Sequence, residues 1–286
     1  MTEFLTQTLN GLSFAGVLFL LSSGFTLIFG LMRIVNMAHG ATYLVGGYVA
    51  YSVLAATGSY LLAIIAAPVA MAVLGLLLER VLLQRIRGLP EPELLLTMGV
   101  AFVMTDLALG IWGGDPLTVQ SPGFLRSSLH LGSITYPIDR LAIFGLAVLI
   151  GVALYYVLVR TRTGAIIRAG VDDREMVSAL GINVGRVFTI VFVAGALLAG
   201  LAGVLGGGLL TLYPGGDSDI LALSVVVVII GGLGKLEGAI VGSFVVGLLN
   251  NYANAYFPEF AYFSLFAPMI VVLLWRPQGL FGSAAV

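Results

Sequence analysis

Long apolar runs with few charged residues inside them constrain the fold of this chain more than any other feature. The first run, residues 12–30, is about long enough to cross a hydrocarbon core of ~30 Å. The 286-residue chain contains 59% hydrophobic and only 9% charged residues, so it has too little polar surface to cover a soluble globule. We therefore expect an all-α integral membrane protein.

Nine apolar runs are candidate membrane-spanning segments. They are residues 12–30, 35–56, 60–78, 94–112, 141–159, 187–213, 220–230, 239–256 and 262–275. The seventh run is short for a full crossing, and a glycine-rich stretch separates it from the eighth, which indicates a broken or tilted hairpin buried within the protein. Eight crossings are the alternative, if the first or the seventh run is not a true span. The sequence predicts a polytopic helix bundle of about eight or nine transmembrane segments in a single domain, residues 1–286.

Basic residues predict how the bundle is oriented. The connections 79–93 and 160–186 are rich in arginine, and Arg33, Lys235 and Arg276 follow or precede other apolar runs. All of them fall on one side if nine segments cross and the N-terminus lies outside. This side is cytoplasmic by the positive-inside rule. The N-terminal residues also lack the basic start of a cleavable signal peptide, so we interpret the first run as a span.

Composition and motifs exclude several classes of function. A net charge of -1 gives no basis for nucleic-acid binding. The absence of cysteine excludes disulfides, thiolate metal sites and a cysteine nucleophile. The run Gly-Gly-Leu-Gly-Lys235 lacks the spacing of a phosphate-binding loop and its Ser or Thr after the lysine. We find no Ser/His/Asp order, paired carboxylates or metal-spaced histidines, and so expect no catalytic residue, metal or cofactor.

The connection 160–186 is the most charged part of the chain, with eight of its 27 charged residues. Its middle predicts a short helix with both ends specified. Asp172 is a good N-cap, and Glu175 three residues later completes a capping box. Gly181 supplies the left-handed conformation that ends a helix.

This short helix has an apolar face and a charged face. Met176, Val177 and Leu180 fall on one side at helical spacing, while Asp173 and Arg174 point away from it. A helix of about two turns is too short to be stable alone in water, so we expect it to be docked. The residues alone leave two alternatives equally open: a helix folded back on its own membrane domain, or a docking surface for a separate protein.

Polar side chains inside apolar runs are costly and therefore informative. Those within or near the ends of the predicted spans are Asn36, His39, Thr97, Thr105, Asp106, Asn250 and Asn254. Asp106 stands about two-thirds of the way along its span, where a carboxylate must pair, become protonated or face water. We favour a hydrogen bond between helices over a transport path for Asp106, and we favour a structural role for His39 more strongly.

Five sequence motifs follow one another along nearly the whole chain. They are Asn10-Gly11-Leu12, residues 24–40 (GFTLIFGLMRIVNMAHG), residues 168–183 (RAGVDDREMVSALGIN), residues 231–234 (GGLG) and residues 276–282 (RPQGLFG). Together they resemble the permease subunits of branched-chain amino acid ABC importers. The resemblance implies a multi-pass permease without enzymatic activity in a bacterial or archaeal cell (inner) membrane. It also implies a second homologous permease, two cytoplasmic ATPase subunits and an extracytoplasmic solute-binding protein as partners.

The resemblance also assigns residues to roles. The segment 172–181 matches the family's coupling helix, which assigns ATPase coupling to Asp172, Asp173, Glu175, Met176, Val177, Leu180 and Gly181. For the translocation path we expect Asn36, His39, Thr97, Thr105, Asp106 and Asn250. For docking of the binding protein we expect Arg126, Asp217 and Asp219, on connections opposite the coupling segment. A solvated outer surface is the alternative for this last set.

Two departures from the family pattern leave the solute open. Lys235-Leu-Glu237 replaces the more usual serine-containing run, and Asp106 stands where a neutral amide is commoner. Relatives of this family carry urea, short amides and aromatic acids as well as branched-chain amino acids. A secondary transporter or a channel is the alternative from another class, because either also places polar residues at mid-membrane. Neither requires a capped cytoplasmic helix.

Overall fold

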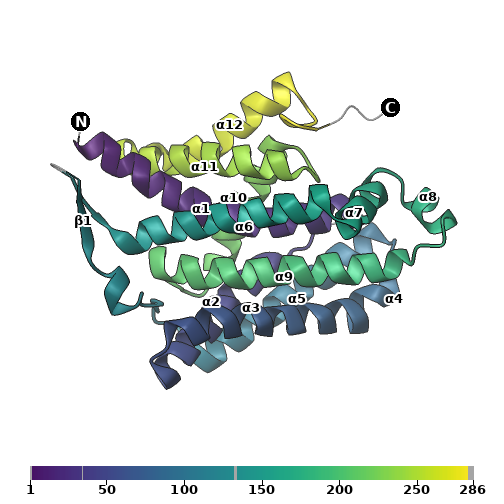
Figure 1. The fold of residues 1–286 in the computed structure, drawn as a ribbon, viewed down its shortest axis with the longest axis horizontal. Coiled ribbons are helices and arrows are strands. Elements are labelled where there is room, and N and C mark those ends of the chain that lie inside the picture. The colour runs from purple at the N-terminus through teal and green to yellow at the C-terminus, as the bar shows by residue number, and fades with distance from the viewer. Residues whose placement is uncertain (1, 34, 132–133, 283–286) are drawn as a thin grey trace.

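The computed structural model describes residues 2–33, 35–131 and 134–282, which form one bundle of helices elongated in the direction of the long helices (Figure 1). The helices are α1 Thr2–Met32, α2 Ala38–Thr57, α3 Tyr60–Leu77, α4 Gln84–Ile86, α5 Pro90–Trp112, α6 Ile138–Arg160, α7 Arg162–Asp172, α8 Arg174–Ala179, α9 Val184–Leu209, α10 Gly216–Gly231, α11 Leu236–Tyr256 and α12 Ala261–Trp275. A π-helical segment, Leu78–Leu83, joins α3 to α4, and 3-10 turns occupy Gly123–Leu125 and Pro258–Phe260.

The predicted fold class is confirmed. Within the described residues, five helical stretches are long and apolar enough to cross a membrane, namely Thr2–Met32, Tyr60–Ile86, Pro90–Trp112, Ile138–Arg160 and Val184–Leu209. The remaining predicted spans also form helices. Among all helices that correspond to predicted spans, α10 and α12 are the shortest. In Figure 1 consecutive long helices run back and forth between the two ends of the bundle.

The chain between α5 and α6 differs from the predicted loop. It contains an antiparallel hairpin, β1 Ser128–Leu131 and β2 Ile134–Pro137, in which Leu129 pairs with Tyr136. Polar and apolar residues alternate in β1, which is the period of a strand. This hairpin lies at the same end of the bundle as the N-terminus (Figure 1).

The predicted short hairpin corresponds to α10 and α11, which pack against each other. The 16 residues of α10 rise only about 24 Å, less than a hydrocarbon core. Gly232 and Gly234 connect the two helices with positive φ values of 101° and 78°, which side-chain-bearing residues rarely adopt. The Gly231 and Gly238 backbones touch, so neither position has room for a Cβ atom.

Helices α1 and α9 form the centre of the bundle. Helix α1 packs against α6, α9, α10 and α11, and α9 packs against α1, α2 and α3. Small residues allow this close approach: a Cβ atom on Gly46 of α2 would lie 2.7 Å from the Gly200 Cα of α9. Inside the core, the Ser22 and Ser224 hydroxyls lie 3.2 Å apart and join α1 to α10.

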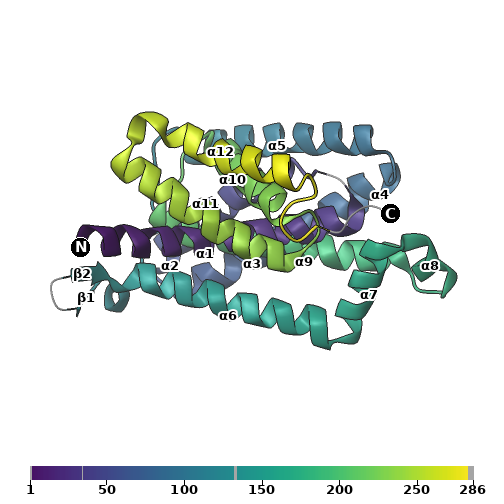
Figure 2. The same ribbon diagram turned by 90° about the horizontal axis from the view of Figure 1, so that it is seen from above.

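Basic residues divide between the two ends of the bundle as the sequence predicts. Of the 13 lysines and arginines, only Arg126 and Arg140 belong to segments at the end that holds the β-hairpin. The others lie at or near the opposite ends of the helices, where α4, α7 and α8 are found (Figures 1 and 2). The positive-inside rule predicts that this second end, called the cytoplasmic end below, faces the cytoplasm.

Candidate functional site

The cytoplasmic connection folds into two helices where the sequence predicts one. Helix α7 turns sharply away from the end of α6, and α8 projects beyond the bundle (Figure 2). The Thr161 side chain caps α7 by accepting a hydrogen bond from the Gly164 N–H at 3.1 Å. Gly164 contacts the Leu158 and Val157 carbonyl oxygens so closely that a Cβ atom would not fit, which fixes the turn.

Helix α7 returns to the bundle and packs on it. Ile167 is buried, and Gly170 faces Leu31 near the end of α1. Val171 lies close to Gly234, in the connection between α10 and α11. The base of the connection is therefore fixed to the membrane domain, and only α8 extends beyond it.

The start of α8 lies one residue after the predicted position. Asp173, with extended backbone angles, is the N-cap, and its Oδ1 accepts a hydrogen bond from the Met176 N–H at 2.9 Å. Asp172 is instead the last residue of α7. The predicted capping box is therefore wrong, because Glu175 is only two residues from the cap. Its carboxylate lies in the first turn, where a negative charge interacts favourably with the helix dipole.

The end of α8 is as predicted. Gly181 has a φ of 78°, and its N–H donates to the Ser178 carbonyl at 3.0 Å. The Ile182 N–H donates to the Val177 carbonyl at 3.4 Å. These two bonds form a Schellman motif, which satisfies the last carbonyls of the helix.

The three apolar residues of α8 do not share one environment. Val177 is only 3% exposed and packs against its own chain. Met176 and Leu180 are 58% and 71% exposed, at the polar cytoplasmic end of the protein. Exposed apolar side chains on a projecting, capped helix are typical of a docking surface. Coupling through Met176 and Leu180 stays a prediction, whereas Val177 is covered in this structure.

A buried charged cluster near the same end was not expected from the sequence. Glu79, in the π-helical segment, is fully buried and forms an ion pair with Arg87. The Thr189 hydroxyl of α9 donates to the Glu79 carboxylate at 2.8 Å, and the Arg87 guanidinium lies 4.7 Å from the centre of the Phe188 ring. The cluster joins the end of α3 to the first turns of α9, which follow α8 in the chain.

Three of the predicted path residues lie in the packed interior. The Asn36 side chain accepts from the N–H of Ala38, the first residue of α2, at 3.1 Å, and Thr97 accepts from the Met37 N–H at 3.2 Å. The His39 ring nitrogen Nε2 lies 2.9 Å from the Leu21 carbonyl, so it joins α2 to α1. Asn36 and Thr97 line a cavity of only about 10 Å³, which is near the limit for a single water molecule. The Thr97 and His39 bonds join α2 to neighbouring helices, whereas the Asn36 bond is local to the start of α2.

Thr105 and Asp106 lie side by side on α5, next to the start of α10. The Thr105 hydroxyl donates to Asp217 Oδ2 at 3.0 Å. Asp106 is exposed and, with Thr105, Pro214 and apolar residues of α5, lines an open hollow of about 440 Å³.

Asn250 is placed away from Thr105 and Asp106. It lies on α11, which packs against α1, α10 and α12, whereas α5 packs chiefly against α2. Its side-chain oxygen accepts from Asn254 Nδ2 at 2.7 Å within the same helix. The six predicted path residues therefore do not form one lining.

The predicted docking residues at the outer end also separate. Arg126 is exposed and donates to the Ser121 carbonyl at 2.7 Å, and Asp219 is exposed and accepts from the Tyr213 hydroxyl at 2.7 Å. Asp217 is only 8% exposed, so its predicted position on the outer surface is wrong. The chain after α9 folds inward, through the Leu117 N–H bond to the Leu212 carbonyl at 2.8 Å, and α10 starts within the bundle.

The outer hairpin is anchored to α1 by a polar cluster. The Tyr136 hydroxyl donates to Asn10 Oδ1 at 3.1 Å and lies 3.3 Å from the Ser13 hydroxyl, and Arg140 also donates to Asn10. Burial raises the pKa of Tyr136 above its ordinary value. Asn10 belongs to one of the sequence motifs, but its role in holding the hairpin could be recognised only from the structure.

The described residues contain no group of three or more His, Asp or Glu side chains that could hold a metal ion. Residues 7–273 match the family described as branched-chain amino acid transport system, permease component. The chain belongs to this family. It is a polytopic helical membrane permease, as the sequence predicts.

Relatives of this permease come from bacteria and from an archaeon. The high-affinity branched-chain amino acid transport system permease protein LivH of Escherichia coli (strain K12) is 30% identical over 308 residues, covering 99% of this chain and 97% of the relative. BraD of Pseudomonas aeruginosa, described in the same words, is 27% identical over 99% of this chain and 97% of the relative. A probable LivH of Methanocaldococcus jannaschii is 25% identical over 94% and 90% of the two chains. These relatives agree with the predicted location in the cell (inner) membrane. No solved structure matches the chain significantly.

Proposed function

We propose that the chain, acting as one domain, is the membrane permease subunit of a binding-protein-dependent importer of branched-chain or other hydrophobic amino acids. ATP is hydrolysed in two separate cytoplasmic subunits, and a second homologous permease completes the translocation path. The solute class rests on the names of relatives that match nearly the whole chain. Urea, short amides and aromatic acids are the alternative solutes.

The observation that carries this proposal is the geometry of α8. A six-residue helix has little stability of its own, yet both of its ends are capped by hydrogen bonds. It presents Met176 and Leu180 to the solvent at the end rich in basic residues. Such a helix, fixed at its base by α7 and followed directly by α9, is suited to transmit movement of a docked ATPase subunit to the membrane helices.

The hollow beside α5 supports the position of the path. Asp106 lies among exposed apolar side chains of α5, including Phe102, Val103 and Leu107. A carboxylate facing lipid there would cost several kcal/mol on insertion scales. Contact with the second permease or with a water-filled path removes this cost, so this face of α5 is best placed at the centre of the assembled transporter.

The proposal is tested with Leu180→Asp in the full complex. Loss of a central, well-packed apolar contact typically costs 2 kcal/mol or more, so the ATPase subunits should bind about 30-fold more weakly. Solute-stimulated ATP hydrolysis and uptake should be lost, while the permease still reaches the membrane.

Ser178→Asp is the matched control, because Ser178 is exposed on the same helix and on the opposite side from Leu180. It adds the same charge and should preserve coupling. Normal stimulation in Leu180→Asp would show that α8 is not the docking element. Uptake by the permease alone, without any ATPase, would instead indicate a secondary transporter.

A further inference from the structure

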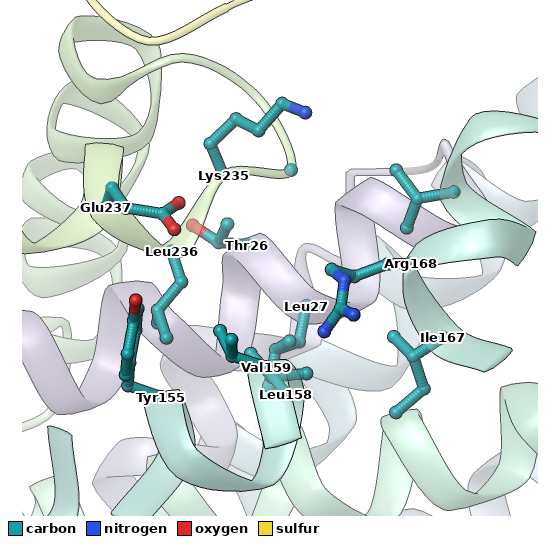
Figure 3. A pocket seen from close by; sticks show the side chains of 12 residues that line it. Thr26, Leu27, Tyr155, Leu158, Val159, Ile167, Arg168, Lys235, Leu236 and Glu237 are labelled. Carbon is teal, nitrogen blue, oxygen red and sulfur yellow. The ribbon is translucent and has the colours of Figure 1, made fainter. Parts of the chain in front are cut away.

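A cavity at the cytoplasmic end lies between the membrane domain and the connection 160–186, called the coupling connection here. It has a volume of about 170 Å³ and lies between the ends of α1 and α6, the helix α7 and the connection that precedes α11 (Figure 3). Three charged side chains line it: Arg168, Lys235 and Glu237. In Figure 3 Arg168 and Glu237 lie on opposite sides of the cavity, and Leu27, Leu158 and other apolar side chains lie below them.

The polar groups of this cavity have no partners within the described chain. None of Arg168, Lys235 and Glu237 forms an ion pair with a residue that the structure describes. The Thr26 side chain is 2% exposed, and its hydroxyl has no hydrogen-bond partner among the same residues. Figure 3 shows this hydroxyl directed toward the side of the cavity that holds Glu237. Buried polar groups are normally satisfied, so the Thr26 hydroxyl is an exception among the described residues, whereas Arg168 and Glu237 are exposed at the mouth of the cavity.

An apolar groove continues from this cavity into the membrane region. Tyr155 lines both spaces. The groove has a volume of about 390 Å³ and lies between α1, α6 and α11; its walls include Gly16, Phe19, Ala147, Gly151, Ile240 and Phe244. Small residues of α1 and α6 let the two helices approach closely along this groove: a Cβ atom on Gly16 would lie 3.1 Å from the Ala147 Cβ atom.

The length of the groove matches one leaflet of a bilayer. From Tyr155 to Phe144, α6 rises about 16 Å. Half of a hydrocarbon core of ~30 Å is about 15 Å. A ligand with a charged group at the cytoplasmic boundary and an apolar tail of this length fits the combined shape.

We propose that this site binds a phospholipid of the cytoplasmic leaflet, with its phosphate between Arg168 and Lys235 and one acyl chain in the groove. The three charged side chains sum to one positive charge, which balances one phosphodiester. The occupant is therefore a singly anionic phospholipid, phosphatidylglycerol, whose glycerol hydroxyls donate to Glu237. Bound in this way, the lipid links α7 to α1 and α11 and stiffens the base of the coupling connection.

The test measures lipid retention by the delipidated full-length permease, titrated with phosphatidylglycerol and followed by native mass spectrometry. Each basic residue near a membrane surface contributes about a 5-fold preference for an anionic lipid. Arg168→Ala combined with Lys235→Ala should therefore weaken binding by about 25-fold. The control, Arg85→Ala combined with Arg160→Ala, removes the same charge at the same end, outside the cavity, and should bind normally.

Two further variants separate the proposal from simple misfolding. Glu237→Gln keeps an oxygen that can accept from the glycerol hydroxyls and removes the negative charge that repels the phosphate. It should strengthen phosphatidylglycerol binding about 5-fold, a gain that a misfolded protein cannot give. Val152→Trp fills the groove and should lower retention, whereas Val157→Trp, exposed on α6 outside the groove, should not.

Three outcomes would overturn the assignment. They are equal affinity for phosphatidylethanolamine, displacement of the lipid by free leucine, or unchanged lipid binding in both the Arg168→Ala, Lys235→Ala double variant and Glu237→Gln. The readout does not depend on transport, so a failed proposal for the function leaves this result interpretable.

Discussion

The buried Glu79–Arg87 pair allows a quantitative prediction. Arg87→Met keeps much of the side-chain volume and leaves Glu79 buried without its cation. The two side chains are 14% and 0% exposed, for Arg87 and Glu79, so little water replaces the lost charge. Removing one partner of a buried pair typically costs 3–5 kcal/mol.

Two neighbouring contacts adjust this value. The Thr189 hydroxyl remains as a donor to Glu79 at 2.8 Å and offsets part of the loss. The contact between Arg87 and the Phe188 ring, at 4.7 Å, is lost and adds roughly 0.5–1 kcal/mol to the cost. We expect about 3–4 kcal/mol of destabilisation in total.

Thermal unfolding of the purified permease in detergent measures this effect. For a chain of this size, about 3 kcal/mol lowers the unfolding temperature by roughly 6–12 °C. Arg85→Met is the matched control, since Arg85 is exposed in the same turn of chain. Combining Arg87→Met with Glu79→Gln removes the buried charge and should restore much of the loss. The reasoning is refuted if Arg87→Met unfolds at the same temperature as Arg85→Met, or if the second change lowers stability further.

Two other predictions concern the path and the outer face. If Asp106 lines the path, Asp106→Asn and Asp106→Leu should both alter uptake or solute preference in a complex that still assembles. If it only joins the two permeases, the Asn variant should transport normally and the Leu variant should fail to assemble. Normal uptake by the Leu variant would contradict both roles. Arg126→Glu should slow association with the loaded binding protein at low salt, with a smaller effect at high salt. Gln120→Ala, which removes the 2.8 Å bond between Gln120 and Arg126 without changing charge, is the control, and equal association rates for both variants would remove Arg126 from the docking surface.

Signals that act over a few residues were predictable from the sequence. Gly181 ends α8: its N–H donates to Ser178 and the next N–H, of Ile182, donates to Val177. All four residues lie within six positions, so the role of Gly181 could be inferred before any fold was known. The apolar runs likewise predicted the helices. The start of α8 was misplaced because Asp172 and Asp173 are equally good caps. Only the length of α7, a helix that the sequence did not reveal, makes Asp173 the cap.

Features that depend on distant contacts were missed. Glu79 lies in a connection with several arginines, which is typical of a solvent-exposed segment. In the structure it is buried against Thr189, which is 110 residues away in the sequence. Asp217 follows Pro214 and two glycines, which indicate an exposed turn. That turn folds inward and places Asp217 beside Thr105, 112 residues earlier in the chain. Neither burial can be obtained from local patterns, because both result from helix packing.

The contacts at the cytoplasmic end imply how movement of α8 would reach the membrane. On one side α8 follows α7, which is held against Leu31 of α1 and against Gly234. On the other side it leads into α9, whose Phe188 and Thr189 are tied to the buried pair of Glu79 and Arg87. Helices α1 and α9 are the two central helices, and they pack against each other. Because packed cores switch between discrete arrangements instead of deforming continuously, we expect that a displacement of α8 would reach both central helices at once. Coupling therefore depends on the contacts that hold the two ends of the connection as much as on the exposed residues of α8.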